Sequence, residues 1–298
     1  MNLISPSNSG DDEPAREGCV LNPVACRHRI ETRRLVLRAA EQVAPARALV
    51  LGAGQCAEIP LAELAARFAQ VTLNDIAREP LETALAGVDA ASRTKITLHV
   101  EDLTGVVERL FGRIRERIAS ARDAVSASAA MSRLLDARRQ RPPAIAGPFD
   151  LVIASCVLSQ LQFSLTRRCD ELFERRFPGQ LRTLRDSPPW KAGLRKLTPR
   201  MKAAFLGDLE WLTAPGGLIV LSDTVQVCFV AQTAEGGWKT LGTFRTLRAT
   251  SRLKDVLDER FRILDEAHWK WVRSAPSGPG KPGRFYDVEG LVVRPGAG

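Results

Sequence analysis

The sequence has no apolar stretch of the roughly 18 to 20 residues that a membrane-spanning helix needs. Residues 1–17 are polar and acidic, which is not the composition of a secretory signal peptide. The six cysteines are scattered along the chain, and no pair has the spacing of a zinc knuckle. We therefore expect a cytoplasmic protein with reduced thiols, no membrane contact and no metal site.

Aromatic residues are also scarce, at 6% of the 298 residues. Few rings are available to stack on nucleobases, which makes an RNA partner less favoured than a small molecule. No helix-turn-helix or zinc-finger pattern occurs, so we expect no sequence-specific DNA binding. The oligomeric state is not predicted by any of these features.

Basic residues exceed acidic ones by nine, and the excess is concentrated in two stretches. Residues 105–148 contain nine arginines against four acids, and residues 162–202 contain eleven basic residues against four acids. The remainder of the chain is therefore slightly acidic. The two stretches are interpreted either as an electrostatic clamp for an anionic ligand or RNA, or as the solvated face of helices.

Five apolar runs alternate with helical patterns: 48–51, 71–73, 96–100, 149–154 and 218–222. Such alternation requires crossover connections and predicts a parallel sheet with helices on both faces. Two further β-like runs, 269–272 and 286–293, flank a loop rich in glycine and proline, so they are expected to pair antiparallel.

The predicted fold class is α/β: a Rossmann-like, doubly wound, mostly parallel seven-stranded sheet with an antiparallel terminal hairpin. Residues 105–148 and 162–202 are too long to be plain connections and are expected to be two helical inserts. Residues 1–29 lack a hydrophobic period and are expected to form a flexible arm before a single domain, 30–298.

Three polar features follow the first three predicted strands. Gly52-Ala53-Gly54 lies directly between a strand and a helix, where glycines let the backbone approach a ligand. Asp75 ends the second strand, at the position of a ribose-binding acid, and Asp102 follows the third. Because carboxyl ends of adjacent parallel strands share one crevice, these features are expected to converge. Each also has a structural interpretation, as a packing turn or a helix cap.

Two cofactor classes fit this arrangement. Residues 52–57 match the G-x-G-x-x-(G/A) dinucleotide fingerprint, so an NAD(P)-dependent oxidoreductase is one alternative. The whole pattern also resembles the class I S-adenosylmethionine-dependent methyltransferases over residues 30–293. The resemblance rests on the glycine turn at 49–56, the acid ending 71–75, the Asp in 99–103, the fourth-strand motif 149–155 and the Pro-Gly-Gly turn at 214–218. That family's last strand is inserted antiparallel, which agrees with the expected hairpin.

The resemblance implies S-adenosyl-L-methionine as the cofactor. It implies that the turn contacts the methionine part and ribose, Asp75 the ribose hydroxyls, and Asp102 the adenine amine, with Leu103 beside the ring. The implied cofactor-binding residues are Gly52, Ala53, Gly54, Cys56, Asp75, Ile76, Asp102, Leu103 and Ser155. Two departures are clear: Val50 stands where the family often has an acid, and Cys56 where it has a third glycine. Glu58 is a nearby carboxylate that could substitute.

The methyl acceptor is not identified by any motif. Neither an Asn-Pro-Pro-Tyr-type motif nor a Pro-Cys pair is present, which leaves O- or N-methylation of a small, possibly anionic acceptor, or an RNA target. Ser155, Cys156, Ser159, Gln160 and Asp223 follow the fourth and fifth strands and are expected to line the acceptor pocket. No catalytic base is assigned. A non-catalytic scaffold, suggested by Val50 and Cys56, is the remaining alternative.

Overall fold

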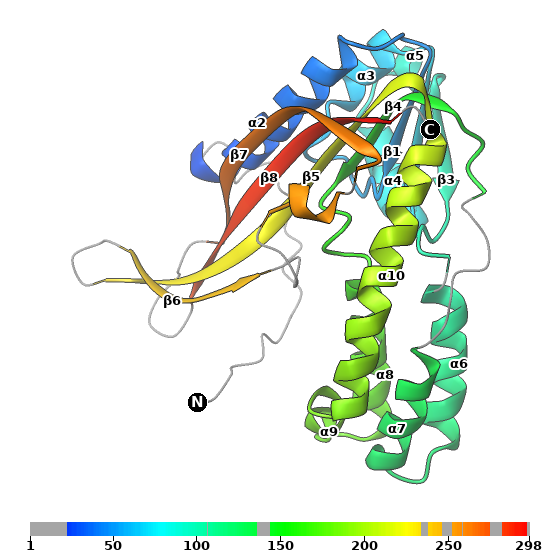
Figure 1. The fold of residues 1–298 in the computed structure, drawn as a ribbon, viewed down its shortest axis with the longest axis vertical. Coiled ribbons are helices and arrows are strands. Elements are labelled where there is room, and N and C mark those ends of the chain that lie inside the picture. The colour runs from blue at the N-terminus through cyan, green and yellow to red at the C-terminus, as the bar shows by residue number, and fades with distance from the viewer. Residues whose placement is uncertain are drawn as a thin grey trace.

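Five parallel β-strands form the centre of the protein (Figure 1). The structure is a computed structural model, and it describes residues 23–105, 107–135, 144–233, 238–245, 252–257, 259–274 and 282–296. These strands are β1 (Arg47–Leu51), β2 (Gln70–Asp75), β3 (Ile96–Val100), β4 (Phe149–Ser155) and β5 (Thr213–Gln232). They lie in the order β3-β2-β1-β4-β5, and every neighbouring pair is parallel. This is the doubly wound order of Rossmann-like sheets.

Antiparallel strands extend the sheet beyond β5. β8 (Gly283–Pro295) pairs antiparallel with β5, and β7 (Phe261–Ser274) pairs antiparallel with β8 at the sheet edge. The hairpin predicted from the sequence is therefore confirmed, and its last strand is inserted between β5 and β7.

The prediction of seven strands is wrong by one. An additional strand, β6 (Trp238–Arg245), pairs antiparallel with the second half of β5. β5 itself runs well past the expected end at Ser222, because its pairing with β8 continues to Val230 and its residues Gln226 to Gln232 pair with β6. The result is a four-stranded antiparallel extension that projects past the carboxyl edge of β1 and β4 (Figure 1).

Helices cover both faces of the sheet because successive residues of each strand point to opposite sides. On one face, Val50 and Ile153 pack against α2 (Pro23–Ala40), α3 (Leu61–Arg67) and α4 (Arg78–Ala86). On the other face, Leu49 and Val152 pack against the helices of the two inserts. A short helix, α5 (Ala90–Arg93), precedes β3.

Both basic stretches are helical, as predicted, and together they form one bundle that projects away from the sheet (Figure 1). The bundle contains α6 (Val107–Ser120), α7 (Ala124–Leu134), α8 (Phe163–Arg176), α9 (Leu181–Arg185) and α10 (Pro188–Leu212). The guanidinium of Arg168 lies over the ring of Phe111 at 4.0 Å, which joins the two inserts. Asp170 pairs with Arg185 at 2.8 Å. Several of the basic side chains therefore have partners within the bundle.

Three boundaries differ from the expectations. α2 begins at Pro23, within the stretch expected to be an arm, while residues 1–22 lie outside the described part of the chain. α10 continues beyond the expected insert end at 202 to Leu212, and β5 begins at the next residue.

No described helix combines the length and apolar composition that would let it cross a bilayer.

Candidate functional site

The glycine turn after β1 is held in a conformation that requires glycine. Gly52 and Gly54 have φ values of +60° and +49°, in the left-handed region that residues with a Cβ rarely adopt. The N–H of Ala53 donates to the carbonyl of Asn74 at 2.8 Å, which ties the turn to β2. A Cβ on Gly52 would lie 2.8 Å from Cγ2 of Val157, whereas a Cβ on Gly54 would meet nothing within 4 Å. An added side chain would therefore collide with Val157 at Gly52, whereas the space beside Gly54 is open.

Asp75 lies beside this open position. Its Oδ2 accepts a 2.9 Å hydrogen bond from the N–H of Gly54, and its Oδ1 accepts a 3.0 Å hydrogen bond from the N–H of Ala77. A carboxylate has about four acceptor positions, so two such bonds leave capacity for a ligand hydroxyl. Ile76, the next residue, is 41% exposed, which places an apolar side chain in solvent at the same edge.

Asp102 is engaged in a helix-capping arrangement. Its Oδ1 accepts hydrogen bonds from the N–H and hydroxyl of Thr104, at 2.9 and 2.6 Å, and its Oδ2 accepts one from the N–H of Val107 at 2.9 Å. These bonds satisfy donors at the start of α6, as an N-cap carboxylate does. Leu103 is half-buried against the core on the bundle side of the sheet.

A cluster of charged and polar groups lies next to the glycine turn. The Glu58 side chain lies beside Ser155 and within electrostatic range of the guanidinium groups of Arg29 and Arg273. Burial raises the pKa of the Glu58 carboxyl, and these partners oppose that rise. Nε of Arg29, on α2, donates to the carbonyl of Ala57 at 2.9 Å, so α2 is attached directly to the turn.

Two cysteines in the left-handed region flank the cluster. Cys56 has φ +53° and Cys156 has φ +55°, values that are uncommon for residues other than glycine. Burial raises the pKa of the Cys56 thiol to about 12 and that of Cys156 well above its usual range. Both groups therefore stay protonated near neutral pH, and neither has the chemistry of a cysteine nucleophile.

The carboxyl ends of β4 and β5 are joined by buried polar contacts. The hydroxyl of Ser222 donates to that of Ser155 at 2.9 Å. Asp223 is fully buried, and its Oδ2 accepts from the N–H of Ser159 at 2.9 Å while Oδ1 accepts from its neighbour Thr224 at 2.7 Å. Burial raises the pKa of Asp223 to about 6. Asp223 thus fixes the segment after β4 and does not itself reach solvent, whereas Gln160 is exposed.

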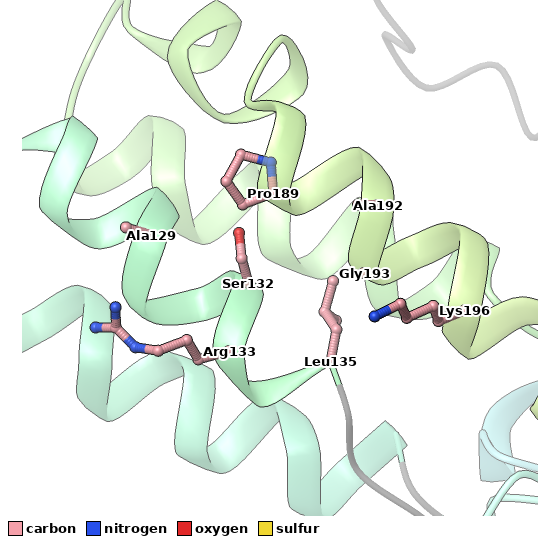
Figure 2. A pocket seen from close by; sticks show the side chains of 8 residues that line it. All are labelled: Ala129, Ser132, Arg133, Leu135, Pro189, Ala192, Gly193 and Lys196. Carbon is pink, nitrogen blue, oxygen red and sulfur yellow. The ribbon is translucent and has the colours of Figure 1, made fainter.

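Two hollows lie within the helical bundle. The first, about 380 Å³, lies between α7 and α10, with Ser132 and Arg133 on one side and Gly193 and Lys196 on the other (Figure 2). The second, about 410 Å³, lies among α8, α9 and α10 and includes Asp170 and Arg185, which pair with each other. Neither is lined by a residue of the glycine turn or of the strand ends.

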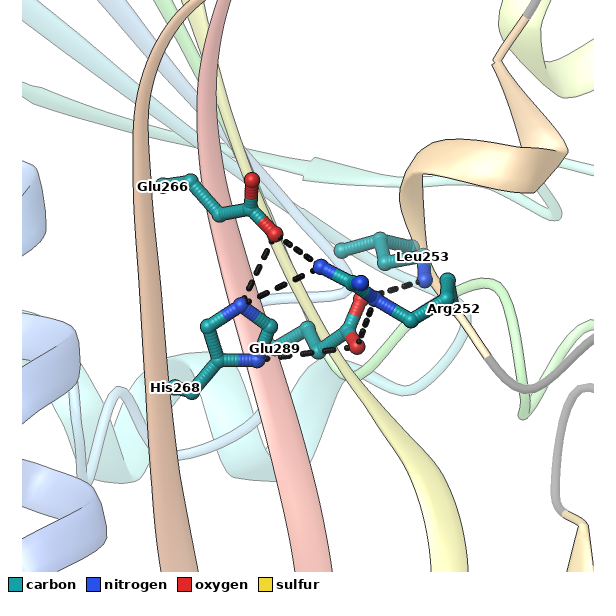
Figure 3. A network of polar contacts seen from close by, with 5 residues as sticks. All are labelled: Arg252, Leu253, Glu266, His268 and Glu289. Atoms are coloured by element: carbon teal, nitrogen blue, oxygen red, sulfur yellow. Dashed lines mark hydrogen bonds and ion pairs between the residues drawn. The ribbon is translucent and has the colours of Figure 1, made fainter.

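The strands β7 and β8 carry one group of potential metal ligands. Oxygen and nitrogen atoms of Glu266, His268 and Glu289 lie within 4.8 Å of one another. Arg252 already lies among them (Figure 3): its guanidinium pairs with Glu266, and its Nε donates to Oε1 of Glu289 at 2.9 Å. Oε2 of Glu289 accepts from the N–H of Leu253 at 2.6 Å. This is an ion-pair network that holds the segment 252–257 against the hairpin.

The structure brings most of the predicted site residues to one edge. The turn 52–56 follows β1, Asp75 and Ser155 are the last residues of β2 and β4, and these three strands are adjacent in the sheet. Ile76 follows β2, and Asp102 lies just beyond the end of the neighbouring β3. Sequence reasoning missed Arg29 and Arg273. They come from opposite ends of the chain and have no local motif. Arg273 also lies at an irregular position of the β7–β8 pairing, between Val272 and Ser274, so strand alternation does not indicate it.

Comparisons with known proteins found similar folds only. Neither a family model nor a curated protein matches the sequence. An S-adenosylmethionine-dependent methyltransferase from Clostridium acetobutylicum has a TM-score of 0.43 and 10% identity, covering 95% of this chain and 100% of its own. The CcbJ methyltransferase from Streptomyces caelestis has a TM-score of 0.41 and 11% identity, covering 90% of both chains. A methyltransferase from Leishmania major has a TM-score of 0.41 and 14% identity, covering 89% of this chain and 71% of its own.

The strand order supplies the fold assignment by itself. The resemblance predicts a parallel sheet whose last strand is inserted antiparallel, and β8 is inserted antiparallel between β5 and β7. The chain has a Rossmann-like, doubly wound α/β fold with an antiparallel inserted last strand, as the resemblance predicts, with β6 and the helical bundle as additions.

Proposed function

We propose that this protein is an S-adenosylmethionine-dependent methyltransferase. The observation that carries the proposal is the open backbone at Gly54, which is hydrogen-bonded to the carboxylate of Asp75 at the carboxyl edge of the sheet. A ligand can approach the backbone there without meeting a Cβ, and Asp75 has acceptor capacity for ribose hydroxyls. When bound, S-adenosylmethionine supplies a methyl group on a positively charged sulfur.

The cluster around Glu58 has the groups that a zwitterionic methionine end requires. In this proposal Glu58 pairs with the ammonium group, and Arg29, whose guanidinium lies within electrostatic range of Glu58, pairs with the carboxylate. The family often has an acid at the position of Val50, and in this proposal Glu58 supplies that missing carboxylate. Gly52, Ala53, Cys56 and Ser155 form the surrounding wall.

The adenine end is assigned to Ile76, Asp102 and Leu103. Exposed Ile76 provides an apolar surface for the ring, and covering it would remove apolar area from water. Asp102 keeps its capping bonds to Thr104 and Val107 in this arrangement, and its place at the carboxyl end of β3, next to β2, supports its assignment to the adenine amine.

The acceptor is proposed to be a small molecule that is methylated on oxygen or nitrogen. Cys156 and Ser159 border its side of the site, while Asp223 positions the segment that carries them. We assign no catalytic base. A cytoplasmic location, proposed from the scattered cysteines, agrees with this metabolic role.

Calorimetric titration tests the proposal. The purified chain is titrated with S-adenosylmethionine, S-adenosylhomocysteine, and oxidised and reduced nicotinamide dinucleotides in parallel. Binding of the two sulfur ligands alone is the expected result. Binding of a dinucleotide alone would establish the oxidoreductase alternative, and binding of none would leave a scaffold that has the fold without the cofactor.

A further inference from the structure

A row of aromatic side chains crosses the antiparallel extension of the sheet. Trp271 on β7 pairs in register with Tyr286 on β8, and Tyr286 with Val227 on β5, so all three side chains share one face. The rings of Trp271 and Tyr286 lie 5.4 Å apart. On the same face, Phe244 of β6 is opposite Val227, and its ring contacts that of Phe229 edge-on at 5.7 Å.

The row is partly open to solvent. Phe244 is 51% exposed, and Phe229, Trp271 and Tyr286 are half-buried. His28 stacks on Trp271 at 4.2 Å and therefore closes the row at its α2 end. Partly exposed aromatic rings on the surface of a sheet can stack on another planar group. We call this row, formed by Phe229, Phe244, Trp271 and Tyr286, the aromatic platform.

Cationic groups accompany the rings. The guanidinium of Arg273 lies 5.4 Å from the centre of the Trp271 ring, and Arg284 is opposite Phe229 in the register. The described residues on and around the platform are not acidic: they are Val227, Phe229, Gly242, Phe244, Trp269, Trp271, Arg284 and Tyr286. Asp265, farther along β7 on this face, pairs with Arg38 of α2 at 2.7 Å, and the paired charges Lys270 and Asp287 lie on the opposite face. The platform is therefore complementary to an anion.

The platform is continuous with the candidate site. Arg273 lies within electrostatic range of Glu58 and Cys156, both beside the glycine turn. β5 carries the platform outward from Ser222, which is opposite Ser155 at the carboxyl edge. Arg273 therefore links the platform to the cluster beside the glycine turn.

We infer that this aromatic platform binds the acceptor, and that the acceptor is a planar aromatic small molecule carrying an anionic group. Its ring stacks on the row that includes Trp271 and Tyr286, and its anion pairs with Arg273 and Arg284. This inference rests on the proposed function, because it names the substrate class of the same site.

The test uses 1-hydroxy-2-naphthoate as a fluorescent probe on the full chain. Decahydro-2-naphthoate has the same charge without the aromatic ring, and 1-naphthol has the ring without the charge. We expect both to bind about tenfold more weakly than the probe, because each lacks one of the two recognised features. Equal binding of all three compounds would overturn the inference.

Variants locate the binding surface. Arg273→Gln and Trp271→Leu are each expected to weaken probe binding about tenfold, while Lys270→Gln, one residue away on the opposite face, leaves it unchanged. Because Trp271 also packs against His28, Phe244→Ala provides a solvent-exposed alternative that does not depend on that contact. Unchanged binding in Arg273→Gln and Phe244→Ala would place the probe elsewhere.

S-adenosylhomocysteine binding, measured on the same samples, separates the two proposals. Probe binding without S-adenosylhomocysteine binding would defeat the proposed function and leave the platform. S-adenosylhomocysteine binding without probe binding would defeat the acceptor inference alone. An oligouridylate that binds in place of the probe and depends on Arg273 would replace the small molecule with RNA as the occupant.

Discussion

The N–H of Gly54 donates a 2.9 Å hydrogen bond to Oδ2 of Asp75, so the glycine turn after β1 and the acid ending β2 form one unit. Replacing Asp75 with Asn removes the charge and one of the two acceptor oxygens. We expect affinity for S-adenosylhomocysteine to fall about 10- to 100-fold, the usual value of hydrogen bonds to a charged group. Calorimetry measures the loss, and Asp89→Asn, on the exposed cap of α5, is the matched control. Unchanged affinity in a folded Asp75→Asn protein would contradict the ribose assignment.

Alanine at the two glycines of the turn should have separable effects. At Gly54 the added Cβ meets no protein atom, so only the left-handed backbone conformation lowers the free energy of unfolding, by about 1–2 kcal/mol. The same Cβ occupies the space where the ligand approaches, so ligand binding should be obstructed. At Gly52 the Cβ would also be 2.8 Å from Val157, and the free energy of unfolding should fall further. Urea unfolding combined with ligand titration distinguishes the two. Equal stability loss at both positions would show that packing against Val157 is not limiting.

Asp223 should make stability depend on pH in an uncommon direction. Burial raises its folded-state pKa to about 6 from 3.8, so its ionisation opposes folding. The protonated Asp223 side chain favours the folded state, and the free energy of unfolding therefore falls by at most about 3 kcal/mol as pH rises from about 4 to 6. Asp223→Asn removes this titration. Urea unfolding at several pH values should show the wild type gaining stability relative to the variant on acidification; a constant difference would refute the shifted pKa.

His28 should act in the opposite direction over nearly the same range. Burial, with Arg273 nearby, lowers its pKa from 6.5 to about 4, and its Nδ1 accepts a 2.9 Å hydrogen bond from Nε1 of Trp269. Folding therefore requires the neutral ring, and stability is lost as pH falls from about 6.5 to 4, by at most about 3 kcal/mol. In His28→Gln, which keeps an acceptor for Trp269, the loss should disappear. Persistence of the full acid sensitivity in this variant would assign it to other groups.

Two glycines in the bundle should respond oppositely to alanine. A Cβ on Gly193 of α10 would lie 2.7 Å from Cδ1 of Leu135, so Gly193→Ala should cost about 1–3 kcal/mol through overpacking. Gly112 of α6 has open space around its Cβ position, so Gly112→Ala should stabilise the helix by up to about 1 kcal/mol. Thermal unfolding measures both. A stabilised Gly193→Ala protein would mean that α7 and α10 can separate without cost.

The parallel core was predictable because its strands are continuous apolar runs with polar ends. β3 has the predicted bounds, Ile96–Val100, and β4 begins at the predicted Phe149. The glycine turn and Asp75 were predictable for a related reason, since topology alone brings strand ends together. By contrast, the second half of β5 is only half-buried on both faces, so its hydrophobicity does not alternate clearly, and the pairing with β6 was missed.

The sequence predicted only one member, Glu58, of the charged cluster beside the glycine turn. Glu58 follows the turn and was identified as a candidate, but Arg29 and Arg273 approach it only because α2 packs on β7. Such contacts depend on the register of the terminal hairpin, which includes two irregular positions. One-residue shifts of this kind reverse which face a side chain occupies, and no propensity scale reports them.

The junction between α10 and β5 is short: Leu212 ends the helix, Thr213 already pairs with Phe149 of β4, and the Thr213 hydroxyl donates back to the carbonyl of Leu209 at 2.6 Å. After an irregular stretch at 214–217, regular pairing with β4 resumes at Leu218. The bundle therefore cannot be excised as a cassette, because its longest helix is the direct lead-in to a central strand. A shortened chain would need a new connector at this joint to keep the pairing of β5 with β4.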